Sequence, residues 1–229
     1  MVKLHLKRLS SPRTWPIKKK TLTFIARPNP GPHKLEHQIP ITVFLRDLVS
    51  LVTTSKEVKQ ILHNKDCFVD GVICHDNKRP VGLMDVVSLP KASEFYRLLI
   101  SKKNMLYAVK VSEKESQMKV CKIANKTSLK KGLQQLNATD GRNFLVKDAK
   151  KYSVGDSVQI ELGSQKIIAH FPLVKGAQIL LTSGKYVGQE GVLDSVDHST
   201  AFIKIGDSTI TTLKKFAFVV GTSKSVITL

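Results

Sequence analysis

The first 34 residues constrain this chain more than any other part of its sequence. They contain nine basic residues, five prolines and no acidic residue, and Glu36 is the first carboxylate in the chain. Proline fixes φ and removes a backbone donor, so this stretch cannot form a regular helix or a central strand. Without carboxylates nearby, its charges must be solvated or neutralised by an external polyanion. We therefore expect an extended basic N-terminal arm over residues 1–40.

Charge is distributed unevenly along the rest of the chain. The 229 residues include 37 Lys and Arg against 18 Asp and Glu, a formal net charge of +19. Residues 101–150 hold twelve basic and four acidic residues, whereas residues 35–100 hold eight of each. Because 41% of the residues are hydrophobic, the chain can bury a core, and its unpaired positive field favours a polyanionic partner.

The sequence does not support a membrane protein. It has no run of about 18 apolar residues that would span a bilayer, and no basic amphipathic helix with an aromatic face. The three cysteines, Cys67, Cys74 and Cys121, are too few for a disulfide framework, which favours a reducing compartment. We expect a cytoplasmic protein.

The neutral region after the arm has the pattern of a compact α+β unit. Apolar residues between positions 41 and 52 recur at helical spacing, and Thr54 with Glu57 forms a capping box that opens a second helix. An Asp-Gly pair at positions 70–71 then interrupts a β-branched run, which is typical of a tight hairpin. We predict a helix-helix-β-hairpin module over residues 41–90.

The rest of the chain indicates short strands. Alternating apolar residues separated by glycine-bearing turns favour small β-barrels. We predict a central β-rich domain over residues 91–172 and a second barrel over residues 173–229. The second barrel begins with two apolar strands around Gly184, Gly188 and Gly191, where glycine permits a positive φ or close approach of RNA or protein. Ordinary hairpin turns would also account for these glycines.

Few residues suggest catalysis or metal binding. The histidines and cysteines considered as metal ligands are His33, His37, Cys67, Cys74 and His75. Their spacing fits no zinc motif, so we expect no metal site. Neither a Walker-type phosphate loop nor a nucleophile elbow is present, and turn chemistry explains Asp70 and Asp140, which both precede glycine. We expect no catalytic residue, no cofactor and no small-molecule substrate.

Several stretches together resemble one family. Residues 5–18, His-Leu-Lys-Arg-Leu-Ser-Ser-Pro-Arg-Thr-Trp-Pro-Ile-Lys, resemble the N-terminal signature of the small-subunit ribosomal protein S-four of the archaeal and eukaryotic E type. Residues 28–46 are similar to the next block of that family. The helix-helix-hairpin region resembles an RNA-binding domain shared with bacterial ribosomal proteins and some RNA-modifying enzymes, and residues 179–193 resemble a KOW motif. Two departures are a clipped start and an end at Leu229, where relatives usually continue into a basic extension.

The resemblance implies a structural constituent of the small ribosomal subunit that binds and stabilises its rRNA and supports translation. Its partners would be small-subunit rRNA and neighbouring ribosomal proteins, with nucleolar transit during assembly in a eukaryote. The implied fold is a multi-module α+β chain: a basic arm, an RNA-binding module of S-four type, and small barrels that end in a KOW, or SH3-like, barrel.

Two other classes of protein can carry one of the predicted modules. A pseudouridine synthase can carry the same helix-hairpin module, but its catalytic domain of about 200 residues exceeds what residues 101–229 can supply beside a KOW module. A transcription or elongation accessory factor can carry a KOW module, but this function would leave the acid-free arm unexplained.

We expect the RNA contacts in the basic arm and in residues 101–150. The candidate rRNA-binding residues are Lys3, His5, Lys7, Arg8, Arg13, Trp15, Lys18, Lys19, Lys20, Arg27, His33, Lys34, Lys102, Lys103, Lys130, Lys131 and Arg142, and the KOW turn comprises Gly184, Lys185, Gly188 and Gly191. The cations would neutralise phosphates. Trp15, the only tryptophan, would either stack on an unpaired base or anchor the arm to a protein surface.

Overall fold

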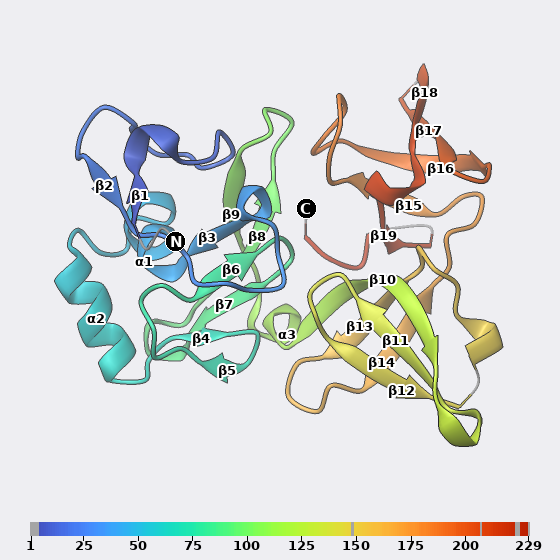
Figure 1. Cartoon of the computed structure of the whole chain (residues 1–229), viewed down its shortest axis with the longest axis horizontal. Helices are drawn as coiled ribbons and strands as arrows, with labels where there is room; N and C mark the ends of the chain where they lie inside the picture. The colour runs from blue at the N-terminus through green and yellow to red at the C-terminus, as the bar shows by residue number, and fades with distance from the viewer. Residues whose placement is uncertain (1–4, 148, 207, 223–224, 229) are drawn as a thin grey trace. The chain divides into compact units, whose positions relative to one another are not determined.

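A computed structural model describes residues 5–147, 149–206, 208–222 and 225–228, except for the side chains of Lys131 and Ala149. These residues form mostly β-structure, with short helices and several small sheets (Figure 1). The chain divides into two compact units. Unit 1 comprises Met1–Ile100 and Asn104–Gln117, and unit 2 comprises Ser101–Lys103 and Met118–Leu229.

The N-terminal segment of unit 1 is folded, which corrects the expectation of an extended arm. Strands β1 (Leu6–Lys7) and β2 (Phe24–Ile25) form an antiparallel ribbon, and the N–H of Arg8 continues it by donating to the carbonyl of Thr23 at 2.9 Å. The prolines do exclude long regular elements, as expected. Apolar side chains nevertheless hold the segment in place, since Trp15 and Ile25 are buried.

The first predicted helix is present but irregular. Strand β3 (Gln38–Pro40) leads into α1 (Ile41–Val43), which continues as a π-type turn at Phe44–Leu48. The second helix, α2 (Ser55–His63), opens with the predicted capping box, because the Thr54 side chain accepts the N–H of Glu57 and the Glu57 carboxylate accepts the N–H of Thr54. The capping box is therefore confirmed.

A five-stranded sheet completes unit 1, in the order β5-β4-β7-β8-β9. Its strands are β4 (Phe68–Val69), β5 (Val72–Ile73), β7 (Val86–Leu89), β8 (Glu94–Ile100) and β9 (Leu106–Lys110); β6 (Pro80–Gly82) pairs separately with β3. The predicted hairpin at positions 70–71 is confirmed, since Asp70 and Gly71 have φ of 52° and 75° between β4 and β5. Short helix α3 (Glu113–Ser116) supplies Glu115, whose carboxylate pairs with the buried guanidinium of Arg97.

Unit 2 contains two five-stranded antiparallel sheets. The first has the order β12-β11-β10-β13-β14, and the second has the order β18-β17-β16-β15-β19 (Figure 1). The strands of the first are β10 (Met118–Ser128), β11 (Gln134–Ala138), β12 (Asn143–Val146), β13 (Ser157–Glu161) and β14 (Ile167–Phe171). The strands of the second are β15 (Gln178–Leu181), β16 (Glu190–Val196), β17 (Thr200–Ile205), β18 (Ser208–Leu213) and β19 (Ala217–Gly221).

Inward-facing aliphatic side chains hold each sheet of unit 2 together. Val158 and Ile160 of β13 are fully buried, and so are Ile179 of β15 and Ile203 of β17. Strand β17 carries its buried side chains at alternate positions, as expected for a strand with one buried face, whereas all five residues of β19 are buried. In the part of the chain that the structure describes, no helix is long and apolar enough to cross a membrane.

Candidate nucleic-acid interface

The folded N-terminal segment of unit 1 presents several exposed cations. Among the candidate residues there, those with exposed side chains are His5, Lys7, Arg13, Lys18, Lys20 and Lys34. Lys19 and Arg27 are half-buried, and the Lys19 ammonium donates to the carbonyl of Ser11 at 3.1 Å. Lys3 lies outside the described residues. In unit 2, Lys102, Lys103, Lys130 and Lys185 are exposed, and the side chain of Lys131 lies outside the description.

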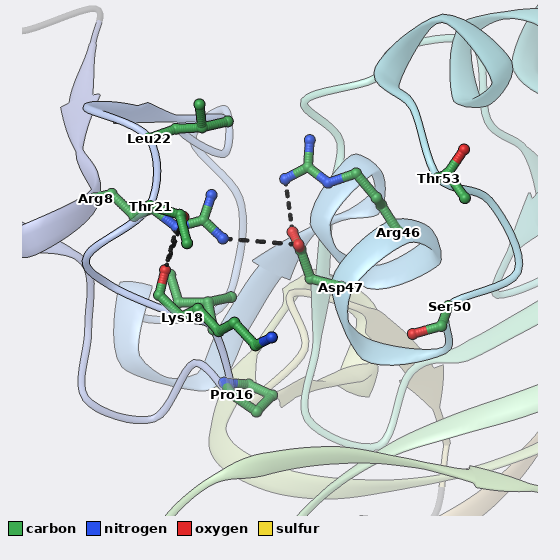
Figure 2. Close-up of a pocket in the computed structure, with 10 residues that line it drawn as sticks. Arg8, Pro16, Lys18, Thr21, Leu22, Arg46, Asp47, Ser50 and Thr53 are labelled. Carbon is green, nitrogen blue, oxygen red and sulfur yellow. Dashed lines mark hydrogen bonds and ion pairs between the residues drawn. The ribbon is translucent and has the colours of Figure 1, made fainter.

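Arg8 has internal partners, which the sequence interpretation did not anticipate. Its Nε donates to the carbonyl of Lys18 at 2.6 Å, and its Nη2 lies 3.7 Å from Oδ1 of Asp47 (Figure 2). Arg46 reaches the same carboxylate, with its Nη2 at 2.6 Å from Oδ2. The expectation that the segment has no carboxylate to pair with is therefore wrong for Arg8, because folding brings Asp47 to it from the π-type turn.

These side chains line an open pocket of about 470 Å³, here called the basic pocket. Its walls come from the N-terminal segment and from the turn that follows α1. The lining residues are Arg8, Pro16, Ile17, Lys18, Thr21, Leu22, Arg46, Asp47, Ser50 and Thr53 (Figure 2). Three of them are cationic and one is anionic, so an anion such as a phosphate would meet net positive charge and three hydroxyls here.

Trp15 belongs to the core of unit 1. Its side chain is 2% exposed, and its Nε1 donates to the carbonyl of Gln38 at 2.8 Å. The neighbouring Thr14 donates through Oγ1 to the carbonyl of Glu36 at 2.7 Å, and its carbonyl accepts the N–H of Leu106 at 2.7 Å. A buried indole with a satisfied N–H cannot offer a face to a base. The base-stacking interpretation of Trp15 is therefore wrong, and the residue anchors the segment to its own unit.

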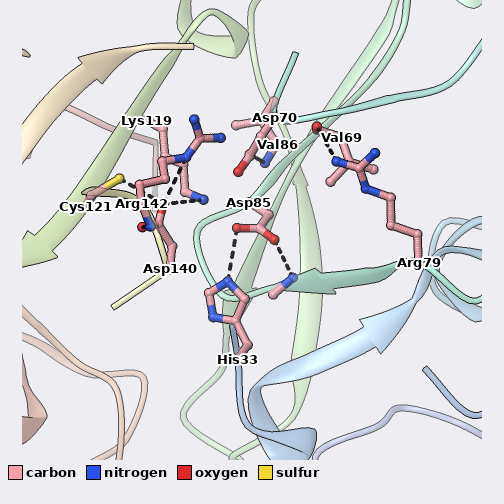
Figure 3. A network of polar contacts seen from close by, with 11 residues as sticks. His33, Val69, Asp70, Arg79, Asp85, Val86, Lys119, Cys121, Asp140 and Arg142 are labelled. Atoms are coloured by element: carbon pink, nitrogen blue, oxygen red, sulfur yellow. Dashed lines mark hydrogen bonds and ion pairs between the residues drawn. The ribbon is translucent and has the colours of Figure 1, made fainter. Parts of the chain in front are cut away.

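His33 is also engaged within unit 1. Its Nε2 lies 3.4 Å from Oδ1 of Asp85, while Oδ2 of Asp85 accepts the N–H of Gly82 at 2.6 Å (Figure 3). The ring packs directly over Gly82, where an added Cβ would lie 2.0 Å from the imidazole. This arrangement gives His33 a structural role in joining the segment to β6.

The basic stretch 101–150 contains cations that are buried in the first sheet of unit 2. Lys119 is 1% exposed, and its Nζ lies 3.1 Å from Oδ2 of Asp140. Arg142 approaches the same oxygen through Nε at 3.2 Å, and the Cys121 thiol donates to it at 3.2 Å (Figure 3). Burial acts to raise the pKa of Asp140, but the Lys119 ammonium and these hydrogen bonds outweigh burial and hold that pKa below its ordinary value. Arg142 is thus a partner of a buried carboxylate.

Lys122 joins the two sheets of unit 2. From β10 its ammonium donates to the carbonyls of Lys215 at 2.9 Å and Ala217 at 2.5 Å, and it lies 3.4 Å from that of Lys214. Burial, with a smaller contribution from the Lys214 charge, lowers the pKa of Lys122 to about 8. The side chain is 8% exposed, so it contributes to folding and is not presented to an external anion.

The glycine turn between β15 and β16 contains two kinds of glycine. Gly184 and Gly188 have φ of 94° and 70°. These values lie in the left-handed region, which residues other than glycine rarely adopt. Gly191 packs against β17, where an added Cβ would lie 2.6 Å from Cγ2 of Ile203. At Gly188 an added Cβ would also lie 2.3 Å from the backbone of Ser101 in the same unit. The close backbone approach expected at this turn therefore occurs within the protein.

Sequence interpretation missed two surface residues. Arg46 lies in a region whose charges sum to zero, and only the fold shows that it faces the basic pocket. Phe24 has an exposed side chain in the middle of the basic segment. The sequence signal for Phe24 is an aromatic residue among lysines and prolines.

The three cysteine side chains are buried in the protein. Burial raises the pKa of Cys67 to about 12, and it also raises the pKa of Cys74 and Cys121. Thiols with raised pKa values are poor nucleophiles and poor metal ligands. Within the described ranges, no group of three or more His, Cys, Asp or Glu side chains is placed to hold a metal ion.

The fold and this surface together define a class: basic, β-rich proteins that display cations on a folded scaffold. Comparison with known proteins narrows the class. A model of the ribosomal family S4e matches residues 92–167, and a model described as the RS4NT (NUC023) domain matches residues 2–36.

Individual relatives match over nearly the whole chain. The small ribosomal subunit protein eS4 of Methanothermobacter thermautotrophicus is 37% identical over 232 residues, which cover 98% of this chain and 95% of that protein. The eS4 protein of Korarchaeum cryptofilum is 37% identical over 192 residues, covering 84% and 81%. A crystal structure of the 30S ribosomal protein S4e from Thermoplasma acidophilum matches with a TM-score of 0.71 and 26% identity, covering 82% of this chain and 96% of that one. The chain belongs to the ribosomal S4e family.

Proposed function

We propose that this protein is a structural constituent of the small ribosomal subunit, in which it binds and stabilises small-subunit rRNA. Full-length relatives named as small ribosomal subunit proteins support the assignment to the ribosome. One observation supports the RNA contact: exposed cations gather on the N-terminal segment, whose sequence contains no carboxylate before Glu36. Neighbouring ribosomal proteins are the other expected partners.

The proposed rRNA surface consists of the exposed cations of the N-terminal segment together with the basic pocket. Lys7, Lys18 and Lys20 are exposed on this segment, and Lys18 also lines the pocket. Each cation that reaches a phosphate releases condensed counterions, so such a surface binds RNA with a strong dependence on salt. Arg46 and Arg8 remain bound to Asp47 at the pocket floor, where they add positive potential without needing to move.

Further exposed candidates in unit 2 are proposed as additional RNA contacts. Lys102, Lys103 and Lys130 are exposed. By contrast, the internal partners of Arg8, Trp15, His33 and Arg142 support structural roles, so we remove these four from the set of primary RNA contacts.

The modular assignment is part of the same proposal. It comprises an N-terminal basic segment at 1–40, an RNA-binding module of S-four type at 41–90, a central β-rich domain at 91–172 and a KOW or SH3-like barrel at 173–229. The capped helix α2 and the hairpin at positions 70–71 support the second module, and the five-stranded sheet β15–β19 with its glycine turn supports the last.

A non-enzymatic role in the cytoplasm fits these features. The named relatives are ribosomal proteins, which disfavours a pseudouridine synthase or a KOW-containing accessory factor. We assign the chain no catalytic residue and no cofactor.

The experiment compares two triple variants of the full chain in binding to transcribed small-subunit rRNA. Lys7, Lys18 and Lys20 are replaced by Gln in the test variant, and the matched control replaces three exposed lysines outside the proposed surface, Lys56, Lys114 and Lys166. We expect the test variant to lower the slope of log affinity against log salt concentration by about 2–3, since each lost phosphate contact contributes roughly 0.7–0.9. The control should lower it by less than about 1.

Two results would contradict the proposal. One is an equal loss of salt slope in both triple variants, which would mean that RNA binding depends only on the total charge of the protein. The other is a wild-type protein that fails to cosediment with small subunits from a cell lysate at moderate salt. The first result would reject the proposed surface, and the second would reject the ribosomal role itself.

A further inference from the structure

Phe24 is a large apolar side chain exposed on the ribbon of the N-terminal segment. Its side chain is 56% exposed, and its ring meets that of His5 edge to face, with centroids 5.8 Å apart and an interplanar angle of 90°. The backbone beneath it is fixed on both sides. The next residue, Ile25, is buried, and the preceding Thr23 accepts the N–H of Arg8. The ring is therefore presented on a rigid strand.

The surroundings of this ring are cationic. Lys7 is its cross-strand partner in the ribbon, directly opposite Phe24. Two residues earlier, Leu22 is 66% exposed and lines the basic pocket together with Lys18. A ligand lying on Phe24 would thus contact an aromatic face opposite Lys7 and, toward Leu22, the basic pocket, in which three cations outnumber one carboxylate.

We propose that Phe24, supported by His5, is a stacking platform for an unpaired base of rRNA. The inference rests on the proposed function and specifies which feature of the RNA the surface around Phe24 recognises. Every base has an apolar π face and an adjacent phosphate, so stacking on Phe24 would bring that phosphate to Lys7 or to the basic pocket. An apolar protein partner fits less well, because covering Phe24 would desolvate its opposite neighbour Lys7 without supplying an anion.

The experiment separates aromatic stacking from apolar contact. Phe24→Leu keeps an apolar side chain without a π face, whereas Phe24→Trp keeps an aromatic face. Binding of the full chain to transcribed small-subunit rRNA is measured at one fixed salt concentration. We expect Phe24→Leu to weaken affinity about 5- to 100-fold, the range that the loss of one stacked base produces, and Phe24→Trp to stay within about threefold of wild type. Neither variant should change the salt slope, because neither changes charge.

Crosslinking of the wild-type protein provides a test that does not depend on a variant folding. Irradiation of the complex at short ultraviolet wavelength, followed by mass spectrometry, should give a peptide containing Phe24 joined to one nucleotide in an unpaired region. Wild-type affinity for Phe24→Leu together with no such crosslink would overturn the proposal. Equal losses for Leu and Trp, with unchanged melting temperatures, would also overturn it in favour of a shaped apolar contact with a protein. A wild-type protein without rRNA affinity would instead reject the proposed function.

Discussion

Residues 1–34 and residues 101–150 carry similar net positive charge, but they use it differently. In the first stretch, most of the cations that the structure describes reach solvent, and the exceptional Arg8 is held by Asp47. In the second, seven of the described lysines are also exposed, but Lys119 and Lys122 are buried, and Arg142 is bound to the carboxylate of Asp140. A lysine counts toward RNA binding only if its ammonium can meet a phosphate. Residues 1–34 also contain no carboxylate, whereas residues 101–150 contain four, and this difference ranks the N-terminal segment above the central stretch as the RNA-binding region.

The largest expected effect comes from the buried cluster of the central stretch. Asp140→Asn should destabilise the protein by about 3–5 kcal/mol, since Lys119 would remain as a buried ammonium without its counter-ion. The effect would appear as a lower midpoint of urea unfolding. The pKa of Asp140 is depressed in the folded protein, so its contribution is present at neutral pH and lost as the pH falls below its ordinary value of 3.8. If the Asn variant were as stable as wild type at pH 7, Asp140 would not stabilise the buried Lys119, and the central stretch would not differ from residues 1–34 in this respect.

The second prediction concerns Lys122 and alkaline pH. Its pKa is about 8 in the folded protein against an ordinary 10.5, so the unfolded chain binds more protons between these values. The free energy of unfolding of wild type, relative to Lys122→Met, should therefore rise from pH 8 toward pH 10.5 by up to about 3 kcal/mol, and should stay flat below pH 8. Urea unfolding at a series of pH values measures this difference. A parallel pH dependence of the two proteins would show that Lys122 does not titrate in this range.

The third prediction separates anchoring from RNA contact at Trp15. Trp15→Phe removes the N–H that the carbonyl of Gln38 accepts, and should lower stability by about 1–3 kcal/mol through the orphaned carbonyl. Affinity for rRNA, measured well below the melting temperature, should remain unchanged. If stability were preserved and affinity fell, Trp15 would be an RNA contact after all, and the N-terminal segment would have to open to expose it.

The smallest effect is expected for exposed lysines of the central stretch. Replacing both Lys103 and Lys130 with Gln should lower the salt slope by no more than about 1–2, with unchanged melting temperature. The same rRNA binding assay measures it. A slope change larger than that of the N-terminal triple variant would reverse the ranking of the two regions.

Local features of this fold could be predicted from the sequence, because they depend on neighbours in the chain. The capping box at Thr54 and the hairpin at positions 70–71 are set by residues within four positions of one another. The short strands of the central region also follow from runs of apolar residues between glycine-bearing turns, which are local signals. Recognition of the family also depended on contiguous stretches.

Partners far apart in the sequence could not be predicted. Trp15 meets Gln38 across 23 positions, and Lys122 meets Ala217 across 95. Nothing in the residue types distinguishes a lysine that will face RNA from one that will donate to carbonyls of a second sheet. The sequence therefore proposed more contacts than the fold leaves accessible, since four of the proposed residues have internal partners.

The anchoring of Trp15 has a thermodynamic consequence for assembly. A disordered basic tail loses conformational entropy when it is ordered on RNA, and that loss subtracts from its affinity. Here the indole, Arg8 and the β1–β2 ribbon fix the backbone in the free protein. When the N-terminal segment binds RNA, mainly its lysine side chains and their hydrating water then reorganise. The heat-capacity change of binding should accordingly be small, and association should be rapid even when the RNA arrives only partly folded.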